Sequence, residues 1–208
     1  MKYWKLSHVV SALVLTLLIN PLSAATLTQV SITSDPDDFI GQGQSYFLDD
    51  SARWTVEAND WSPENDGLAD FIRFYVSGGT GSDYMSLDFS THQLNHEMRV
   101  GDYTRVTRAA IAPAGWAGLD VSINSRGAGS LLGNFTVLEA VFDYSQATPT
   151  LVSFAAEFEQ HIGGNPPGLY GSIYYNYELK PVPVPAAVWL FSAGLLGLLG
   201  VARRKTSS

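Results

Sequence analysis

Three acid–base side chains near the end of the sequence follow the alternation of a β-strand. Glu157, Glu159 and His161 occupy every second position, so all three project from one face of an extended strand. A Glu–His pair of this kind is able to transfer protons or hold a metal ion. The positions between them are filled by Phe158 and Gln160, as in a core strand with a solvated outer face. We expect no catalysis here, and a hydrolase that uses this group is the least favoured function.

Two histidines, His92 and His96, lie four positions apart, which is the spacing of zinc ligands on a helix. The segment has no Glu beside the first His to act as general base, and it has little helical character, so we expect solvent-exposed loop histidines. The chain has no cysteine, which excludes a thiol nucleophile and a zinc–thiolate site. It also lacks a Gly-x-Ser-x-Gly nucleophile motif. We therefore predict no catalytic residue, no cofactor and no enzymatic activity.

A group of acidic residues forms the weak metal candidates of the chain. Asp35, Asp37 and Asp38 precede Asp49 and Asp50, and carboxylate oxygens are the ligands that Ca²⁺ prefers. The group lacks the ligand spacing and the sixth-position glycine of an EF-hand loop. Turn formation by Asp explains these residues without a metal, so no metal site is predicted.

Two tryptophans, Trp61 and Trp116, are the candidates for ligand binding. Each is expected in a loop, close to a Pro or a Gly, where an exposed ring can stack on a sugar. Packing in the core or at its edge is the competing interpretation. A carbohydrate-binding, lectin-like module is accordingly the alternative function.

The segment that must position these residues, residues 26–180, has the size of one domain and the periodicity of strands. Turn-forming clusters of Gly, Pro, Asn and Asp separate the strands at fairly regular intervals, and no useful amphipathic helical period is present. This pattern predicts an all-β fold, a single β-sandwich, with a jelly-roll-like arrangement or a barrel as second choice. The expected strands are residues 26–32, 45–48, 53–58, 68–77, 84–89, 101–111, 117–124, 132–143, 151–161 and 169–179, with a bulge near Leu138 and Glu139.

The first 25 residues have the pattern of an export signal. Lys2 and Lys5 give a positive start, residues 9–19 form an apolar run, and residues 23–25 are small, as at a signal-peptidase cleavage site. We expect residues 1–25 to be a signal peptide removed on export.

The last 28 residues, 181–208, combine three features in a fixed order. A proline-containing motif, residues 182–187, precedes an apolar run over residues 186–202. At about 1.5 Å per residue this run is long enough to span a bilayer core as a helix. A basic cluster follows and would hold the end of the chain in the cytoplasm; it consists of Arg203, Arg204 and Lys205.

This tail resembles the PEP-CTERM sorting signal of Gram-negative bacteria. The motif residues are Val182, Pro183, Val184, Pro185, Ala186 and Ala187, with Val184 in place of the Glu that gives the family its name. The resemblance implies an exosortase as partner, a membrane-embedded cysteine transpeptidase that cleaves near the motif. It also implies an organism that makes exopolysaccharide, so a role in an extracellular or biofilm matrix is expected.

The middle region, over most of residues 34–177, resembles an uncharacterised bacterial extracellular β domain without established activity. The resemblance implies a disulfide whose two positions hold Ala128 and Ile162 in this chain, and hence that these two residues lie near each other. The motifs that carry it are residues 37–44, 85–89, 101–103, 118–121, 154–161 and 171–173.

The charge of the domain limits its partners. Residues 26–180 hold 7 of the 12 Lys and Arg but all 20 Asp and Glu, a net charge of −13. Such a surface repels nucleic acid.

Together these features predict an exported protein that its C-terminal helix anchors transiently in the membrane. An exosortase then processes it for display or release as a structural or binding protein, with extracellular polysaccharide as a possible partner.

Overall fold

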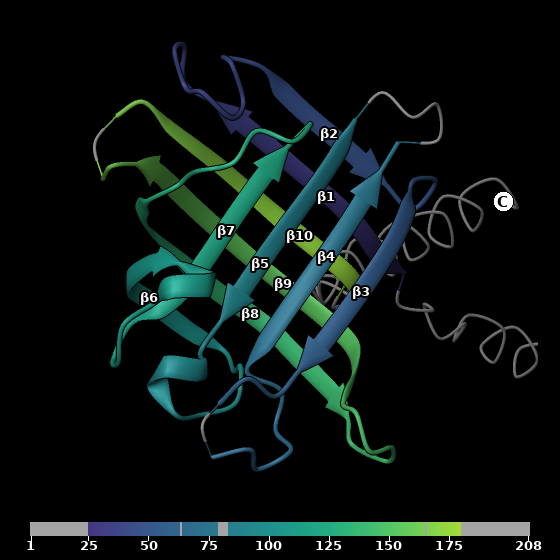
Figure 1. Cartoon of the computed structure of the whole chain (residues 1–208). Coiled ribbons are helices and arrows are strands. Elements are labelled where there is room, and N and C mark those ends of the chain that lie inside the picture. The colour runs from purple at the N-terminus through teal and green to yellow at the C-terminus, as the bar shows by residue number, and fades with distance from the viewer. Residues whose placement is uncertain (1–24, 63, 79–82, 165, 180–208) are drawn as a thin grey trace, which may run out of the picture. The chain divides into compact units, whose positions relative to one another are not determined.

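The computed structural model describes residues 25–62, 64–78, 83–164 and 166–179 (Figure 1). Ala25–Glu178 form one compact unit. Its regular structure is almost entirely β, with short 3-10 helices at His92–Leu94 and Ala109–Ile111, which confirms the all-β prediction. The strands are β1 (Thr26–Ser34), β2 (Ser45–Asp49), β3 (Arg53–Asn59), β4 (Phe71–Ser77), β5 (Tyr84–Ser90), β6 (Gly101–Arg108), β7 (Ala117–Ile123), β8 (Leu131–Asp143), β9 (Thr150–Ile162) and β10 (Gly168–Glu178).

The strands hydrogen-bond into a single ten-stranded sheet in the order β2-β1-β10-β9-β8-β6-β7-β5-β4-β3. Neighbouring strands are antiparallel, except that β6 and β7 run parallel over a short stretch. The sheet curls, so that β3, β4, β5 and β7 lie across β1, β10, β9 and β8 (Figure 1). The two halves of one sheet thus face each other, with the core between them.

Aromatic side chains from both halves meet in this core. Phe74 of β4 lies 5.5 Å from Phe154 of β9, and Phe89 of β5 lies 5.4 Å from Phe135 of β8, measured between ring centroids. Along β4 the even-numbered residues face inward and are buried, whereas Arg73 and Tyr75 face outward. The period of two in the sequence therefore separates an apolar inner face from a polar outer face.

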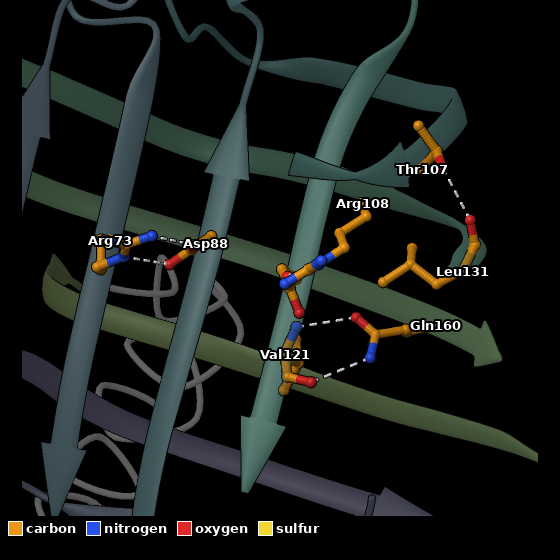
Figure 2. Close-up of polar contacts among 8 residues, drawn as sticks. Arg73, Asp88, Thr107, Arg108, Val121, Leu131 and Gln160 are labelled. Atoms are coloured by element: carbon orange, nitrogen blue, oxygen red, sulfur yellow. Dashed lines mark hydrogen bonds and ion pairs between the residues drawn. The ribbon is translucent and has the colours of Figure 1, made fainter. Parts of the chain in front are cut away.

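The predicted inward face of β9 is confirmed: Phe154, Ala156, Phe158 and Gln160 are all buried. Gln160 is the one polar member of this set. Its side-chain amide accepts a hydrogen bond from Val121 N at 2.9 Å and donates one to Val121 O at 3.1 Å (Figure 2). The side chain of Gln160 on β9 thereby pairs with the backbone N–H and C=O groups of Val121 on β7.

The predicted bulge in β8 is also confirmed, because the register with β9 shifts between Val137 and Glu139. The expected strand over residues 101–111 is wrong at its end. It stops at Arg108, and Ala109–Ile111 form a 3-10 turn. The backbone of Ala109 passes so close to Gly118 that a Cβ there would lie 2.5 Å from Ala109 Cα. The 3-10 turn at Ala109–Ile111 fits here because Gly118 has no side chain.

Ile162 of β9 pairs with Leu131 of β8. Ala128 lies three residues before Leu131, so it and Ile162 belong to the same end of the sheet, as the domain resemblance implies. Their proximity within disulfide range stays a prediction.

The described part of the chain contains no helix that combines the length and the apolar character needed to cross a membrane. Of the predicted signal peptide, residues 1–25, all but Ala25 lie outside the described residues. The predicted sorting signal at residues 181–208, with its motif, apolar run and basic cluster, also lies outside them. Both segments remain predictions from the sequence.

Candidate functional site

The outer face of β4, β5 and β7 carries an ordered grid of polar side chains. Strand register sets its rows: Tyr75 pairs with Ser86, which pairs with Ser122. In the next row Arg73 pairs with Asp88, and Asp88 pairs with Asp120. Outward positions on neighbouring strands thus come into direct contact although they lie far apart in the sequence.

The second row is a line of four charges. Arg73 donates to Asp88 twice, Nε to Oδ1 at 2.8 Å and Nη2 to Oδ2 at 2.6 Å (Figure 2). At the other end, Arg108 Nε donates to Asp120 Oδ2 at 2.8 Å. The order across the sheet is therefore cation, anion, anion, cation, and the formal charges cancel.

The two carboxylates in the middle are directly opposed on adjacent strands, and like charges in that position destabilise a sheet. Their side chains are only 10% exposed for Asp88 and 17% for Asp120. Burial raises the pKa of Asp120, against the opposing hydrogen bond from Arg108. The hydrogen bonds that Arg73 donates to Asp88 raise the pKa of Arg73 above its usual range. The arginines are what allow two anions to remain side by side.

Aromatic rings continue this surface along β4. The guanidinium carbon of Arg73 lies 5.1 Å from the ring centroid of Phe71 and 5.7 Å from that of Tyr75. Tyr75 in turn stacks with Tyr84 at 6.2 Å and an interplanar angle of 17°. Trp61 stacks on Phe71 with 3.6 Å between the ring centroids. Cation–π and ring contacts therefore fix the side chains of β4 in place.

A surface hollow of about 550 Å³ lies over this grid. Its floor is formed by the charge row and by Ser86 and Ser122, and the rim includes Tyr84 and the loop residues Ser125 and Gly129. Hydroxyl groups, carboxylate acceptors, guanidinium donors and an aromatic ring face one volume. This combination suits the binding of a polar ligand that also has apolar C–H surface.

Two members of the expected acid–base group, Glu157 and Glu159, line a second hollow of about 420 Å³ on the outer face of β1, β8, β9 and β10. Glu159 accepts hydrogen bonds from His161 Nε2 at 2.5 Å and from Asn134 at 3.1 Å, and these bonds, led by that of His161, lower the pKa of Glu159. Glu157 lies exposed on the same face. The pair exists as predicted, but a carboxylate with a lowered pKa is a poor general acid.

The two tryptophans are not brought together in a groove. Trp61 is 42% exposed and covers the fully buried Phe71, with His92 at its edge. Trp116 is half-buried and precedes β7. Neither ring lines either of the two hollows described above. Trp61 is connected to the charge row through Phe71, on which it stacks and which also contacts Arg73.

Asp70, next to Phe71, is a buried carboxyl beneath the Trp61 loop. Its Oδ1 accepts a hydrogen bond from Trp61 N at 2.8 Å, and its Oδ2 is buried without a partner among the described residues. Burial raises the pKa of Asp70 from 3.8 to about 6, and the bond from Trp61 lowers it in part. The neutral form of this acid is thus favoured by the fold.

The weak calcium candidates serve the local fold. Asp35 accepts hydrogen bonds from Gly168 N at 2.9 Å and Tyr170 Oη at 3.2 Å, and Asp38 from Gly41 N at 2.6 Å. Asp37 is exposed in a turn with a φ of 71°. Within the described residues no three Asp, Glu, His or Cys side chains gather as a metal would require.

The expectation of solvent-exposed loop histidines is wrong, because both are half-buried. His92 lies in the 3-10 turn with Nδ1 2.5 Å from Ser90 Oγ, and burial lowers its pKa. His96 Nδ1 lies 2.8 Å from the carbonyl of Glu97. Each ring is held by its own local contact, so the four-residue spacing does not create a shared ligand site.

Sequence reasoning missed the residues of the β4/β5/β7 grid. The signal was present as alternation: Arg73 and Tyr75, then Tyr84, Ser86 and Asp88, occupy every second position between apolar residues. What the sequence alone does not supply is the register that aligns these strands.

Comparison with protein families, with curated proteins and with solved structures finds no match for this chain.

Proposed function

We propose that this chain is an exported protein that an exosortase processes at the cell envelope, and that its β domain is a non-catalytic structural or binding module of the extracellular matrix. The sequence supports the first part through the signal-peptide pattern of residues 1–25 and the motif, apolar run and basic cluster of residues 181–208. The enclosed domain has the acidity and the single-domain size of an extracytoplasmic module.

The observation that carries the binding role is the charge row. Arg73, Asp88, Asp120 and Arg108 form two ion pairs on the face of the sheet, beside the serines of the neighbouring row. Charges that neutralise each other leave donors and acceptors for a ligand but no free base or nucleophile. We therefore favour recognition over chemistry at this site.

For the fold we propose the β-sandwich rather than the jelly-roll-like arrangement or the barrel. The support is the aromatic core between the two halves of the curled sheet, where Phe74 and Phe89 contact Phe154. Facing layers joined by side chains are the defining feature of a sandwich.

Carbohydrate binding is the second candidate function, and a specific observation favours it. Tyr84 stands 42% exposed at the rim of the hollow over the charge row, stacked on Tyr75. This position, rather than Trp61 or Trp116, offers an aromatic ring beside polar groups. A hydrolase built on Glu159 and His161 is the least favoured function, because hydrogen bonds from His161 and Asn134 lower the pKa of Glu159 and make this carboxyl group a poor general acid.

Cell fractionation tests the localisation. In the native host, the protein should appear at the surface or in the medium when the exosortase is present, and accumulate in the inner membrane when it is deleted. A variant with Pro183→Ala and Pro185→Ala should accumulate likewise, whereas the matched control Pro36→Ala, a change of an exposed proline in the domain, should not. Identical fractionation of all strains would refute the sorting proposal.

A further inference from the structure

We propose that the hollow over β4, β5 and β7 binds a neutral saccharide, with one sugar ring against Tyr84 and its hydroxyl groups on the Arg–Asp row. The inference rests on the proposed binding function and assigns it a site and a ligand class. It uses three observations: a presented aromatic ring, a floor of paired donors and acceptors, and the cancellation of charge.

The ring is held ready for stacking. Tyr84 projects from β5 with 42% of its surface exposed, while its contact with Tyr75 at 6.2 Å restrains the ring. The π face of an aromatic ring is negative and attracts the slightly positive C–H groups that a pyranose presents on its apolar side. Because the ring is already ordered, little side-chain entropy is lost when a ligand stacks on it.

The floor of the hollow offers hydrogen-bond donors beside acceptors, which is what two adjacent sugar hydroxyl groups require. A hydroxyl both donates and accepts, so neighbouring hydroxyls are well matched by an arginine beside a carboxylate. The hydrogen bond from Arg108 to Asp120 uses Nε, and the arginine side chain is 39% exposed. The carboxylate oxygens of Asp88 and Asp120 retain lone pairs, and Ser86 and Ser122 add hydroxyls to the same floor.

The charges decide between neutral and acidic sugars. The four members of the row sum to zero, and Arg73 is held by both oxygens of Asp88. An anionic ligand would have to displace those carboxylates, and it would meet a domain of net charge −13 over residues 26–180. A uronate or a sulfated sugar is therefore disfavoured, whereas a neutral hexose unit meets no such barrier.

The size of the hollow and the cost of building it agree with a ligand site. About 550 Å³ lies within the usual range of small-molecule sites, roughly 300–1,000 Å³. Directly opposed carboxylates on β5 and β7 repel each other, and an arginine at each end of the row offsets that repulsion. The row therefore keeps four charged side chains at the floor of the hollow, where their remaining donors and acceptors are available to a ligand.

The test is titration calorimetry on the full-length chain, kept in a zwitterionic detergent because glycoside detergents would compete. The probes are neutral cello-, manno- and galacto-oligosaccharides, with oligogalacturonate as the acidic counterpart. Two variants address the site: Tyr84→Ala removes the ring, and Ser122→Tyr fills the hollow. The matched control is Tyr177→Ala, which breaks another tyrosine pair, with Tyr174 at 5.5 Å on β10.

We expect at least one neutral oligosaccharide to bind, with both site variants weakening the affinity by roughly tenfold or more, about 1.4 kcal/mol, and the control unchanged. Binding that survives both Tyr84→Ala and Ser122→Tyr would overturn this site while leaving a carbohydrate-binding function in place. Binding of oligogalacturonate alone, or of no probe at all, would overturn the neutral-saccharide inference. The sorting proposal is tested independently by fractionation, so the two failures are distinguishable.

Discussion

Gln160 of β9 pairs through its side-chain amide with both backbone groups of Val121 on β7, in the manner of a neighbouring strand. The pairing is required because β6 lies beside β7 only as far as Leu119. Beyond that point no strand among the described residues lies beside this edge of β7, apart from the isolated bridge between Ile123 and Arg126. An unpaired buried peptide group at Val121 would be costly. Gln160 closes the sheet where its two halves join (Figure 2).

Replacing this glutamine should therefore damage the fold more than its size suggests. We expect Gln160→Leu to lower the free energy of unfolding by about 2–4 kcal/mol, because it leaves the N–H and C=O of Val121 unpaired in the interior. Urea denaturation measures this value. The control is Gln146→Leu at an exposed position, which should change stability by less than about 0.5 kcal/mol. Equal stabilities of the two variants would contradict the role assigned to Gln160.

The two carboxylates of the charge row should differ in their contributions. Asp88→Asn should cost about 2 kcal/mol, because it breaks a two-bond pair with an arginine that is only 27% exposed. Asp120→Asn should cost at most about 1 kcal/mol. Arg108 is 39% exposed, so water screens this pair, and the change also relieves the repulsion from Asp88.

Thermal and urea unfolding of the two variants show which substitution lowers the free energy of unfolding more. Ser86→Ala is the matched reference on the same face. A larger loss for Asp120→Asn than for Asp88→Asn would mean that the row is held mainly from the β7 side, against the geometry described above.

Much of the fold was predictable because a strand with one buried and one exposed face shows a period of two in its sequence. The alternation in β4, β5 and β9 placed their ends within a few residues, and the break in alternation near Leu138 located the bulge of β8. The end of β6 was not predictable, since its cause is the close approach of Ala109 to Gly118, a contact between separate segments. Likewise, nothing local indicates that Gln160 pairs with Val121.

The site was less predictable than the fold. The sequence correctly placed Glu157, Glu159 and His161 on one face, because they belong to one strand. The charge row requires the register of three strands, and the partners Arg73 and Asp88 lie 15 residues apart. Trp61 and Trp116 were predicted as ligand-binding candidates from their residue type alone. In the structure Trp61 stacks on the buried Phe71, so it has a packing role.

Asp70 should make stability depend on pH in the direction opposite to most acids. Its folded-state pKa of about 6 lies above its ordinary value of 3.8, so the folded protein binds more protons than the unfolded chain between these values. The contribution of Asp70 to the free energy of unfolding is therefore greatest below pH 4 and falls as the pH rises through 6. The difference between the two pKa values corresponds to about 3 kcal/mol.

Subtracting the unfolding curves of Asp70→Asn from those of the unchanged protein between pH 4 and pH 7 isolates this contribution. The difference should fall as the pH rises through 6, whereas Leu68→Ala in the same loop, which changes no ionisable group, should leave the pH dependence of stability unaltered. A flat difference for Asp70→Asn would mean that the carboxyl is ionised in the fold at pH 4.

Trp61 should act on stability through the ring it covers. We expect Trp61→Ala to lower the free energy of unfolding by about 2 kcal/mol, because it exposes the otherwise buried Phe71. Trp61→Phe should recover at least half of that loss. Trp116→Ala is the comparison for a half-buried tryptophan outside the stack. If urea unfolding found Trp61→Ala neutral, the ring would be free for a ligand, as the sequence first suggested.

The most direct test of the account is the intact mass of the protein from its native host, with and without the exosortase. The account predicts a mature form that begins after the signal peptide and ends near Pro183 to Pro185, produced only when the exosortase is present. A chain that retains residues 186–208 in both strains would contradict it, and would leave a plain membrane anchor in place of a sorting signal.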